Sequence, residues 1–375
     1  VGLAWKAVQA LLLAERKSPV GHLHEPFSLG DLLDLVALGT VADVADLVGE
    51  NRTLVWAGLE RLRVTERPGL VALMQSAHVA PGEVDAEAIG FWLGPRINAA
   101  GRLEHAMTAY QLLRATTMER AEELAERLEF LNRRRQELTR QALARAEAQI
   151  TDPCAPLLLV SDEQCPEGIV GLVAGRLVEE YYRPAVVVSQ GPEWSKASCR
   201  SIPGFDITEA LDELAPLLER HGGHAAAAGF TVRTENLPAL EKGLIRVAAE
   251  KLSQLDSLCP PLVGDAELPL HDIDHTLFNA LQWLAPFGAK NEAPLWMCRN
   301  VRVRDARQVG SDQKHLKLTL LDERRRTWRA IAFRHGTRYD ALPPVLDIAF
   351  SIKRNEWNGS SRLELHLADF RPAAE

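Results

Sequence analysis

The segment from Thr108 to Ile150 constrains the fold of this chain more than any other, because it contains neither glycine nor proline. It is rich in alanine, leucine, glutamate and arginine, which are strong helix formers. Apolar residues recur along it at steps of four, three, seven and four and therefore share one face of a helix: Leu124, Leu128, Leu131, Leu138 and Ala142. We expect one long helix over residues 108–150 that acts as a spacer between two globular bodies.

Residues 1–107, which precede the predicted helix, carry mainly helical patterns. Val1 to Arg16 reads as an amphipathic helix, because charged residues interrupt its apolar ones. A second amphipathic stretch runs from Asn51 to Leu62. We interpret residues 1–107 as part of an α/β domain.

Strand and helix patterns alternate after Pro153, which indicates a compact α/β domain over residues 151–255. Short runs rich in valine and leucine predict buried strands, and amphipathic runs between them predict helices. The predicted strands are residues 157–160, 185–188, 196–201 and 229–232, and the predicted helices are residues 168–181, 207–220 and 237–255.

Strands outnumber helices from Pro260 onward. Several segments alternate apolar and polar residues with a period near two, and turn signals separate them. This pattern predicts a small β-barrel over residues 256–375, for which an OB fold, a common binder of single-stranded nucleic acid, is the first candidate. The predicted strands are residues 301–304, 316–320, 328–333, 347–353 and 363–367.

The net charge of −8 argues against a protein that coats nucleic acid through bulk positive charge. A local basic groove remains open, because binding depends on where the charges lie. Three arginine groups are candidates, although each alone is more often a solvated surface: Arg133 to Arg135, Arg299 with Arg302 and Arg304, and Arg324 to Arg326. Together they favour a polyanionic partner.

The cysteines and the hydropathy pattern bear on the cellular setting. The cysteines are odd in number, scattered and without a C-x-x-C pair, so neither a disulfide framework nor a zinc knuckle is supported. No window of about 18 uninterrupted apolar residues is present, and the N-terminal stretch does not read as a signal peptide. We therefore expect a cytoplasmic protein without a membrane segment.

The segment from His221 to Gly229, His-Gly-Gly-His followed by four alanines and a glycine, is well suited to contact a ligand closely. Its small residues leave room near the backbone, and its imidazoles supply hydrogen-bonding groups. The preceding stretch from Ser198 to Ser201 adds hydroxyls and a guanidinium, which suit a phosphate. The alternative is a tight turn that leads into close helix packing.

Four motifs follow one another along the chain: Leu38 to Ala45, Gly94 to Leu103, Ser198 to Ser201 with His221 to Gly229, and Leu284 to Gly288. In this order they resemble the motifs of the RecJ family of bacterial single-stranded-DNA-specific exonucleases, within the DHH phosphoesterase superfamily. The resemblance covers essentially the whole chain. It implies the C-terminal part of a DHH catalytic domain at 1–107, a connecting helix at 108–150, a DHH-associated domain at 151–255 and an OB fold at 256–375.

The resemblance implies a catalytic core in which aspartates and histidines hold Mn²⁺ or Mg²⁺, which activate water for phosphodiester hydrolysis. Asp43 corresponds to the last of these aspartates and is the expected catalytic residue and metal ligand, with a helix cap as its alternative role. The other ligands, including the Asp-His-His motif, are expected upstream of Val1, and His22 and His24 do not replace them. The chain is therefore expected to be the C-terminal part of an exonuclease and inactive by itself.

The resemblance also assigns residues to the substrate side. Arg96, Asn98 and Arg102 would contact phosphate or tie their loop by hydrogen bonds. For His224, a satisfied position inside a tight fold is an alternative. The residues expected to hold the terminal 5′ phosphate or nearby backbone are Ser198, Arg200, Ser201, His221, Gly222, Gly223 and His224.

These features predict a metal-dependent, single-stranded-DNA-specific exonuclease of DNA repair and recombination, and only the resemblance supplies its 5′-to-3′ polarity. The resemblance implies single-stranded DNA as partner, a single-strand-binding protein and a helicase as candidate protein partners, and a monomer. The alternatives are a non-catalytic single-stranded nucleic-acid-binding module and a phosphodiesterase for short oligonucleotides or cyclic dinucleotides. Candidates to stack on bases, unless they belong to the core, are Trp296, Trp328, Trp357 and Phe350.

Overall fold

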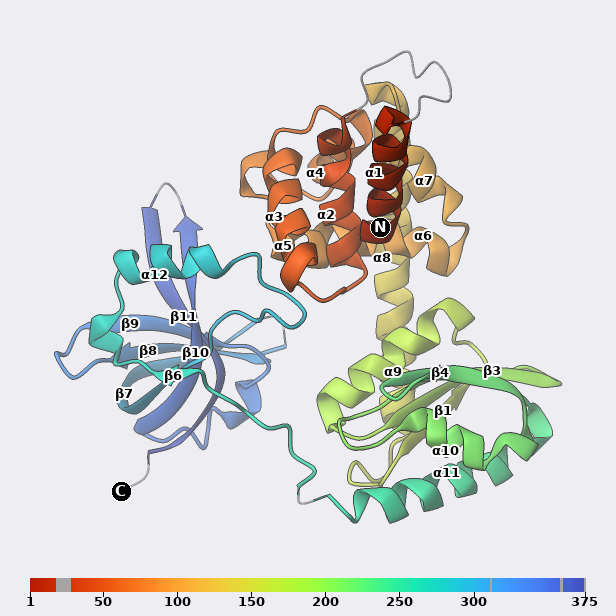
Figure 1. Cartoon of the computed structure of the whole chain (residues 1–375). Coiled ribbons are helices and arrows are strands. Elements are labelled where there is room, and N and C mark those ends of the chain that lie inside the picture. Colours follow the sequence, from red (N-terminus) through yellow and green to blue (C-terminus); the bar gives the residue numbers. More distant parts are fainter. Residues whose placement is uncertain (18–27, 256, 311, 358–359, 374–375) are drawn as a thin grey trace. The chain divides into compact units, whose positions relative to one another are not determined.

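The computed structural model describes residues 1–17, 28–255, 257–310, 312–357 and 360–373 (Figure 1). His22 and His24 lie outside the described residues. The chain divides into two compact units. The first consists of residues 1–62, 85–87 and 262–375, and the second of residues 63–84 and 88–261. Within the described residues, none of the helices combines the length and apolar character needed to span a bilayer.

The described residues before position 107 form helices and no strand, so their share of the expected α/β domain is helical. The two predicted amphipathic helices are confirmed as α1 (Gly2–Lys17) and α3 (Gly49–Arg63). Between them, α2 (Leu33–Ala42) buries Val36, Ala37 and Leu38 and ends at Asp43. The remaining elements of this stretch are α4 (Pro68–Ser76), α5 (Ala86–Ala88), a π-helical turn (Ile89–Leu93) and α6 (Gly94–Leu103).

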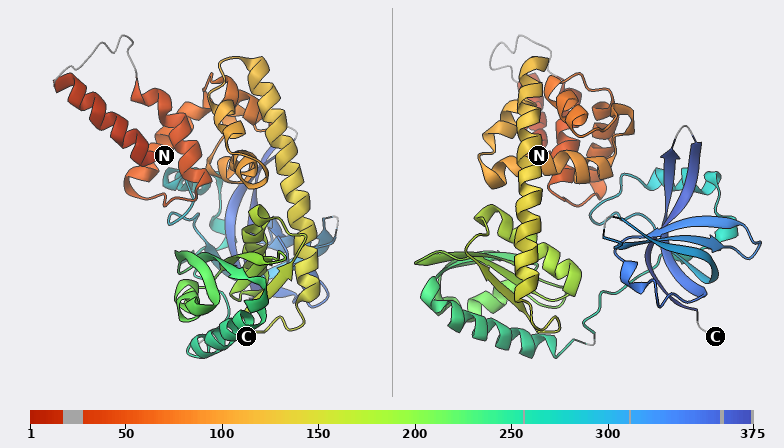
Figure 2. Two further views of the ribbon diagram at one scale, coloured as in Figure 1. Left: turned by 90° about the vertical axis from the view of Figure 1, so that its right-hand side faces the viewer. Right: turned by 180° about the vertical axis from the view of Figure 1, so that it is seen from behind.

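The predicted long helix is α8 (Met118–Gln149) in the second unit (Figure 2). It begins at Met118 rather than Thr108, because a separate helix, α7 (Met107–Leu113), comes first. Thr117 has an extended backbone and caps α8 by accepting a hydrogen bond from the Arg120 amide. The predicted apolar face is confirmed: Leu124, Leu128, Leu131 and Ala142 are buried, and Leu138 is partly buried. Along its length α8 contacts α4 and α6 and then packs on α9 and β1.

The second unit also holds a five-stranded sheet with the order β1-β2-β3-β5-β4. The predicted strands are confirmed as β1 (Leu158–Asp162), β2 (Ala185–Ser189), β3 (Trp194–Arg200) and β5 (Ala227–Arg233). β1 and β2 are parallel, so they need a crossover, which is the predicted helix α9 (Glu167–Tyr181). The other strand pairs are antiparallel.

The helix predicted at residues 207–220 is wrong in its second half. α10 (Ile207–Glu213) ends early, Pro216 lies in a short 3-10 turn, and β4 (Leu218–His224) follows. Proline lacks an N–H donor and its ring clashes with the preceding turn, so it is poorly tolerated inside a helix. The following predicted helix is confirmed as α11 (Leu237–Leu252).

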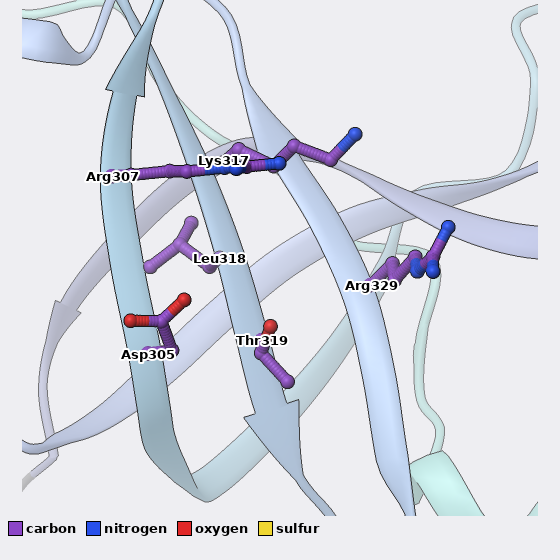
Figure 3. Close-up of a pocket in the computed structure, with 6 residues that line it drawn as sticks. All are labelled: Asp305, Arg307, Lys317, Leu318, Thr319 and Arg329. Carbon is purple, nitrogen blue, oxygen red and sulfur yellow. The ribbon is translucent and has the colours of Figure 1, made fainter.

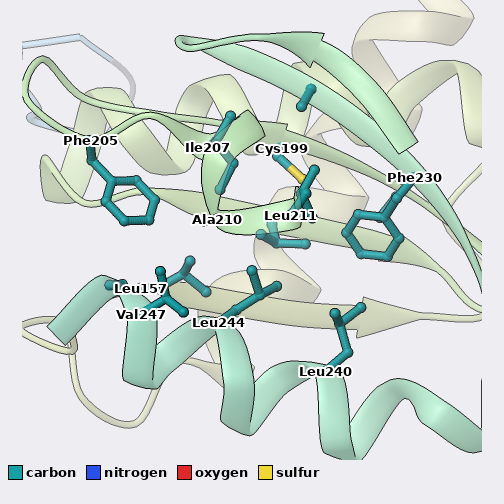
Figure 4. Close-up of a cluster of buried hydrophobic side chains, with 14 of the residues drawn as sticks. Leu157, Cys199, Phe205, Ile207, Ala210, Leu211, Phe230, Leu240, Leu244 and Val247 are labelled. Carbon is teal, nitrogen blue, oxygen red and sulfur yellow. The ribbon is translucent and has the colours of Figure 1, made fainter. Parts of the chain in front are cut away.

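α10 and α11 pack on one face of this sheet and enclose a hydrophobic core (Figure 4). Leu211 of α10 and Leu240 and Leu244 of α11 are fully buried in it. Each fully buried leucine contributes about 1.5–3 kcal/mol relative to an exposed one. Alternate residues of β2 face opposite sides: Val186 belongs to this core, whereas Val187 belongs to a second core with α8 and α9.

The first unit ends in a sheet with the order β10-β11-β9-β8-β7-β6, in which β10 also pairs with β7. Alternation places Leu316, Leu318 and Leu320 of β8 in its core. The arrangement is OB-like, and the strands predicted for it are confirmed. The elements are β6 (Ala266–Glu267), α12 (His275–Leu281), β7 (Trp296–Val309), β8 (His315–Leu321), β9 (Thr327–Ala332), β10 (Val345–Trp357) and β11 (Ser360–Pro372).

Candidate functional site

Ser198 and Arg200 lie on β3 beside the beginning of α9. Arg200 Nη1 donates hydrogen bonds to Ser198 Oγ at 3.0 Å and to the Cys199 carbonyl at 2.8 Å. Gly171 of α9 adjoins both side chains: a Cβ at this position would lie 3.1 Å from Ser198 Oγ and 3.2 Å from Arg200 Nη2. The missing side chain at Gly171 therefore leaves the space in which the hydroxyl and the guanidinium meet.

Four arginines from four elements are linked by pairwise charge interactions, and we call them the arginine cluster: Arg102 of α6, Arg135 of α8, Arg176 of α9 and Arg200 of β3. Partial burial of its guanidinium lowers the pKa of Arg102, and the charge of Arg200 lowers that pKa further. Burial is also the main cause that lowers the pKa of Arg135, followed by the charges of Arg102 and Arg176. The positive charges are thus close enough to repel one another.

Few groups in the surrounding protein neutralise the arginine cluster. Within the part of the chain that the structure describes, Arg102, Arg135 and Arg200 form no ion pair with a carboxylate, whereas Arg176 pairs with Glu179 at 2.8 Å. Asn132 is buried, and its Oδ1 accepts a hydrogen bond from Arg135 Nη2 at 2.9 Å, which fixes the direction of that guanidinium. Unbalanced positive charge on side chains held in this way attracts an anion.

Arg102 reaches the cluster because α6 ends against the first turn of α9. Its Nη1 lies 3.4 Å from the Gly168 carbonyl oxygen. A Cβ on Gly168 would lie 2.0 Å from the Arg102 carbonyl oxygen, so a larger residue would push the two helices apart. The fold thus brings together two of the sequence motifs, residues 94–103 and 198–201.

Arg96, from the first of these motifs, has a structural role instead. It is buried, its Nη1 donates to the Trp92 carbonyl at 2.7 Å, and its Nε lies 2.7 Å from Glu129 Oε2 on α8. These contacts tie the π-helical turn before α6 to α8. Asn98 is exposed on α6. Of the three polar residues predicted in this motif, Arg102 alone joins the arginine cluster.

The His-Gly-Gly-His segment is the end of strand β4 and not a tight turn. Gly222 pairs with Gly229 of β5, and Gly223 pairs with Ala228. Gly223 has φ +154°, and a Cβ there would lie 2.3 Å from the Ala227 carbonyl oxygen. The position therefore requires glycine for backbone reasons, before any ligand is considered.

The two histidines of this segment differ in their surroundings. His221 Nε2 lies 2.7 Å from Asp212 Oδ1, so Asp212 orients its ring. His224 is exposed, so the alternative of a satisfied histidine inside a tight fold is wrong. Ser201 Oγ donates to the Phe205 carbonyl at 2.6 Å, which commits its proton to the loop after β3.

Asp43 lies in the first unit, at the C-terminal cap of α2, and its side chain is exposed. The alternative role as a helix N-cap is wrong, because a carboxylate stabilises the N-terminus of a helix and not its C-terminus. In the described parts of the chain, no three His, Cys, Asp or Glu side chains group closely enough to hold a metal ion. Asp43 by itself therefore does not make a metal centre.

The OB-like sheet carries a hollow of about 290 Å³ on strands β7, β8 and β9, where three basic side chains outnumber one acidic side chain, that of Asp305 (Figure 3). Arg307 lies opposite Lys317 in the strand register, and Thr319 lies opposite Arg329. Like charges directly across a ladder repel one another, so this pairing is not explained by stability. It suits a ligand that carries negative charge. We call Arg307, Lys317 and Arg329 the basic face.

Aromatic rings lie close to the basic face on the same side of the sheet. Phe333 directly follows β9, is 48% exposed, and makes edge contacts with His315 at 5.3 Å and His366 at 5.5 Å between ring centroids. The predicted stacking residues behave differently. Trp296 and Trp328 pack against the core, and Phe350 is fully buried, because these residues occupy the inward phase of their strands. The side chain of Trp357 lies outside the described structure.

The arginine groups noted in the sequence separate into two kinds. Arg135 belongs to the arginine cluster, whereas Arg133 pairs with Glu129 at the surface. Arg299 pairs with Glu267, and Arg326 pairs with Asp322, both within the first unit. A run of neighbouring arginines in the sequence was therefore a weaker signal of a binding surface than single basic residues at outward positions of separate strands, such as Arg307, Lys317 and Arg329.

Two family models match the chain, the DHHA1 domain over residues 155–250 and the RecJ OB domain over residues 264–369. The single-stranded-DNA-specific exonuclease RecJ of Bacillus subtilis is 35% identical, over 98% of this chain and 46% of its own length. The RecJ of Thermus thermophilus is 34% identical, over 93% of this chain and 50% of its own length. The RecJ of Haemophilus influenzae is 30% identical, over 100% of this chain and 68% of its own length.

Solved structures give the same result. Crystal structures of RecJ from Thermus thermophilus in complex with Mn²⁺ and with Mg²⁺ both match with a TM-score of 0.81 and 32% identity over 92% of this chain. The chain covers 50% and 53% of those chains, so it spans about half the length of the first relatives it matches. The chain therefore belongs to the RecJ family of single-stranded-DNA-specific exonucleases.

Proposed function

We propose that this chain forms the strand-binding part of a metal-dependent, single-stranded-DNA-specific exonuclease that degrades DNA from the 5′ end in repair and recombination. The observation that carries the proposal is the arginine cluster beside Ser198. A terminal 5′ phosphate bears up to two negative charges, and guanidinium groups in a fixed arrangement bind phosphate oxygens strongly. An internal phosphodiester bears one charge, so the cluster favours the end of a strand.

Each group at this site has a distinct role in the proposal. Arg200 and Ser198 donate to the phosphate oxygens from β3, and Arg102 approaches from α6. Arg135, oriented by Asn132, adds charge from α8. His224 and Gly222, exposed at the end of β4, are proposed to contact the backbone next to the terminal phosphate.

The basic face of the OB-like sheet is proposed to hold the strand beyond its 5′ end. Arg307, Lys317 and Arg329 would pair with successive phosphates. Phe333 would offer its exposed ring to a base, since stacking tolerates any base sequence. In this proposal Phe333 takes the stacking role that the sequence suggested for Trp296 and Trp328, which pack against the core.

The family relatives solved with Mn²⁺ and Mg²⁺ support these ions as cofactors of the whole protein. When bound, such ions activate water and neutralise charge on the phosphodiester. Asp43 would offer such an ion one hard oxygen ligand, and the described residues contain no group of three metal-binding side chains.

The test compares the affinity of the chain for single-stranded DNA with a 5′ phosphate and with a 5′ hydroxyl, measured by fluorescence anisotropy. Arg200→Ala removes a charge-assisted contact worth about 1.5–3 kcal/mol, so the preference for the 5′ phosphate falls about tenfold or more. Arg246→Ala, an exposed arginine of α11 paired with Glu250, is the matched control and leaves the preference unchanged. An equal affinity of the wild-type chain for both ends would refute the site.

A non-catalytic single-stranded nucleic-acid-binding module is the second candidate, favoured by the lack of a three-donor metal group among the described residues. Incubation with labelled DNA and Mn²⁺ separates the two. Cleavage that Asp43→Ala abolishes supports an enzyme, and binding without cleavage supports a module. For the whole protein we also propose a cytoplasmic monomer that works with a single-strand-binding protein and a helicase.

A further inference from the structure

The turn that follows Asp43 has a strained backbone. Val44 has φ +54°, in the left-handed region that β-branched residues rarely adopt. The Ala45 amide donates to the Thr40 carbonyl at 3.1 Å, which closes a helix-ending turn where glycine usually takes the place of Val44. Val44 is 73% exposed, so burial of its side chain does not offset the strain. The turn's own hydrogen bonds oppose this strain, and contacts from elsewhere in the unit add to them.

A segment distant in sequence, Trp283–Asn291, supplies such contacts, and we call it the clamp segment. It belongs to the same compact unit as Asp43. The Leu47 amide donates to the Ala289 carbonyl at 2.8 Å. Lys290 Nζ lies 2.8 Å from Asp46 Oδ2. The end of the Asp43 turn is thereby attached at two points.

Arg52 of α3 attaches the clamp segment from the other side. Its Nη2 donates to the Trp283 carbonyl at 3.0 Å and to the Ala285 carbonyl at 2.9 Å. Leu47 is fully buried, and a Cβ on Gly288 would lie 2.7 Å from Leu47 Cδ1. The close fit of Gly288 on Leu47 leaves the turn little freedom to shift.

The clamp segment is also braced internally. Asn291 Nδ2 donates to the Leu284 carbonyl at 3.0 Å and to the Pro286 carbonyl at 2.8 Å. The backbones of Gly288 and Asn291 exchange two further hydrogen bonds, at 2.9 and 3.0 Å. These four hydrogen bonds restrain the backbone of the clamp segment.

We infer that the clamp segment helps to hold the Asp43 turn in its strained conformation, which makes Arg52 a positioning residue for the backbone that carries Asp43. The inference rests on the proposed function only where it treats Asp43 as a metal ligand. The clamp segment leads into β7, which carries Arg307 of the basic face, at Trp296. Asp43 is thus linked through the clamp segment to the sheet proposed to hold the strand.

The test uses Arg52→Ala in the whole chain, with Arg61→Ala as matched control, since Arg61 lies on the same helix and pairs with Asp31. Nuclear magnetic resonance follows three signals: the Cα shift of Val44, the exchange rate of the Leu47 amide, and the broadening of amides near Asp43 by Mn²⁺. We expect Arg52→Ala to speed Leu47 exchange about tenfold, to move the Val44 shift away from the left-handed value and to change the pattern of Mn²⁺ broadening. Arg61→Ala leaves all three unchanged.

Val44→Gly distinguishes a clamp segment that holds the conformation of the Asp43 turn from one that only packs against the turn. Glycine adopts the left-handed conformation without strain, so Arg52→Ala with Val44→Gly keeps the turn and restores the Mn²⁺ broadening pattern. If Arg52→Ala does not fold, Lys290→Ala replaces it. The expected increase in the Leu47 exchange rate is then about threefold, because the ion pair of Lys290 is exposed. An unchanged Val44 shift in the clamp variants, or no rescue by Val44→Gly, overturns the inference. Broadening that persists in Asp43→Asn refutes the metal role of Asp43 and leaves the clamp to be judged on the Val44 shift.

Discussion

Gly171→Ala is expected to raise the stability of the chain while it weakens binding of a 5′ phosphate. Alanine inside a helix is favoured over glycine by about 0.8–1.0 kcal/mol. The new methyl group would lie 3.1 Å from Ser198 Oγ and 3.2 Å from Arg200 Nη2, both ends of side chains that can yield by a few tenths of an ångström. The fold therefore tolerates the change, but the guanidinium moves and loses a charge-assisted contact worth about 1.5–3 kcal/mol.

Gly175→Ala on the same helix is the matched control, because a Cβ there meets no atom within 4 Å. Urea denaturation should give a gain of about 1 kcal/mol or less for both variants. Anisotropy titration with 5′-phosphorylated single-stranded DNA should give an affinity about tenfold lower for Gly171→Ala and unchanged for Gly175→Ala. Equal affinities of the two variants would mean that the space beside Gly171 does not receive the phosphate.

Two further predictions concern other parts of the chain. Phe333→Ala should lower the affinity for single-stranded DNA by about 1 kcal/mol or more, whereas Trp56→Ala, at an exposed position of α3 outside the OB-like sheet, should not. A titration in which both variants behave alike would refute the role of Phe333. Burial raises the pKa of Cys199 from its ordinary value of 9.0 to about 12, so the folded chain holds this proton more tightly than the unfolded chain. The free energy of unfolding should therefore decline as the pH rises above 9. Mass spectrometry after alkylation at pH 9 should find the exposed Cys154 modified well before the buried Cys199, and the reverse order would contradict this account.

The elements that could be predicted from the sequence are those with a long, regular pattern. The buried face of α8 and the strands of the OB-like sheet follow from repeated spacing of apolar residues, which depends on local geometry alone. The strand at His221–His224 could not be predicted, since two glycines have low strand propensity and the pairing with β5 is a tertiary contact. The start of α8 was missed because Thr117 acts as a cap within an otherwise helical composition.

The arginine cluster could be predicted only in part. Arg200 and Arg102 lie in recognisable motifs, whereas Arg135 and Arg176 lie on long helices without any local signal. One signal was present, the glycines at 168 and 171 at the start of α9, which mark places where another element approaches a helix closely. Trp296 and Trp328 lie on the inward phase of their strands and pack against the core, because inward residues of a strand are the more apolar ones.

The continuity of α8 has a consequence for how this chain tolerates insertions. Leu128 and Ala142 are separated by 14 residues, or about 21 Å at 1.5 Å per residue, and each is buried against a different neighbour. One inserted residue between them would turn the two ends by about 100° relative to each other and expose one of the buried faces. Insertions of about 7 or 11 residues would instead return both faces nearly to register. The helix therefore fixes the rotation of its two ends relative to each other, and it tolerates only insertions that preserve this rotation.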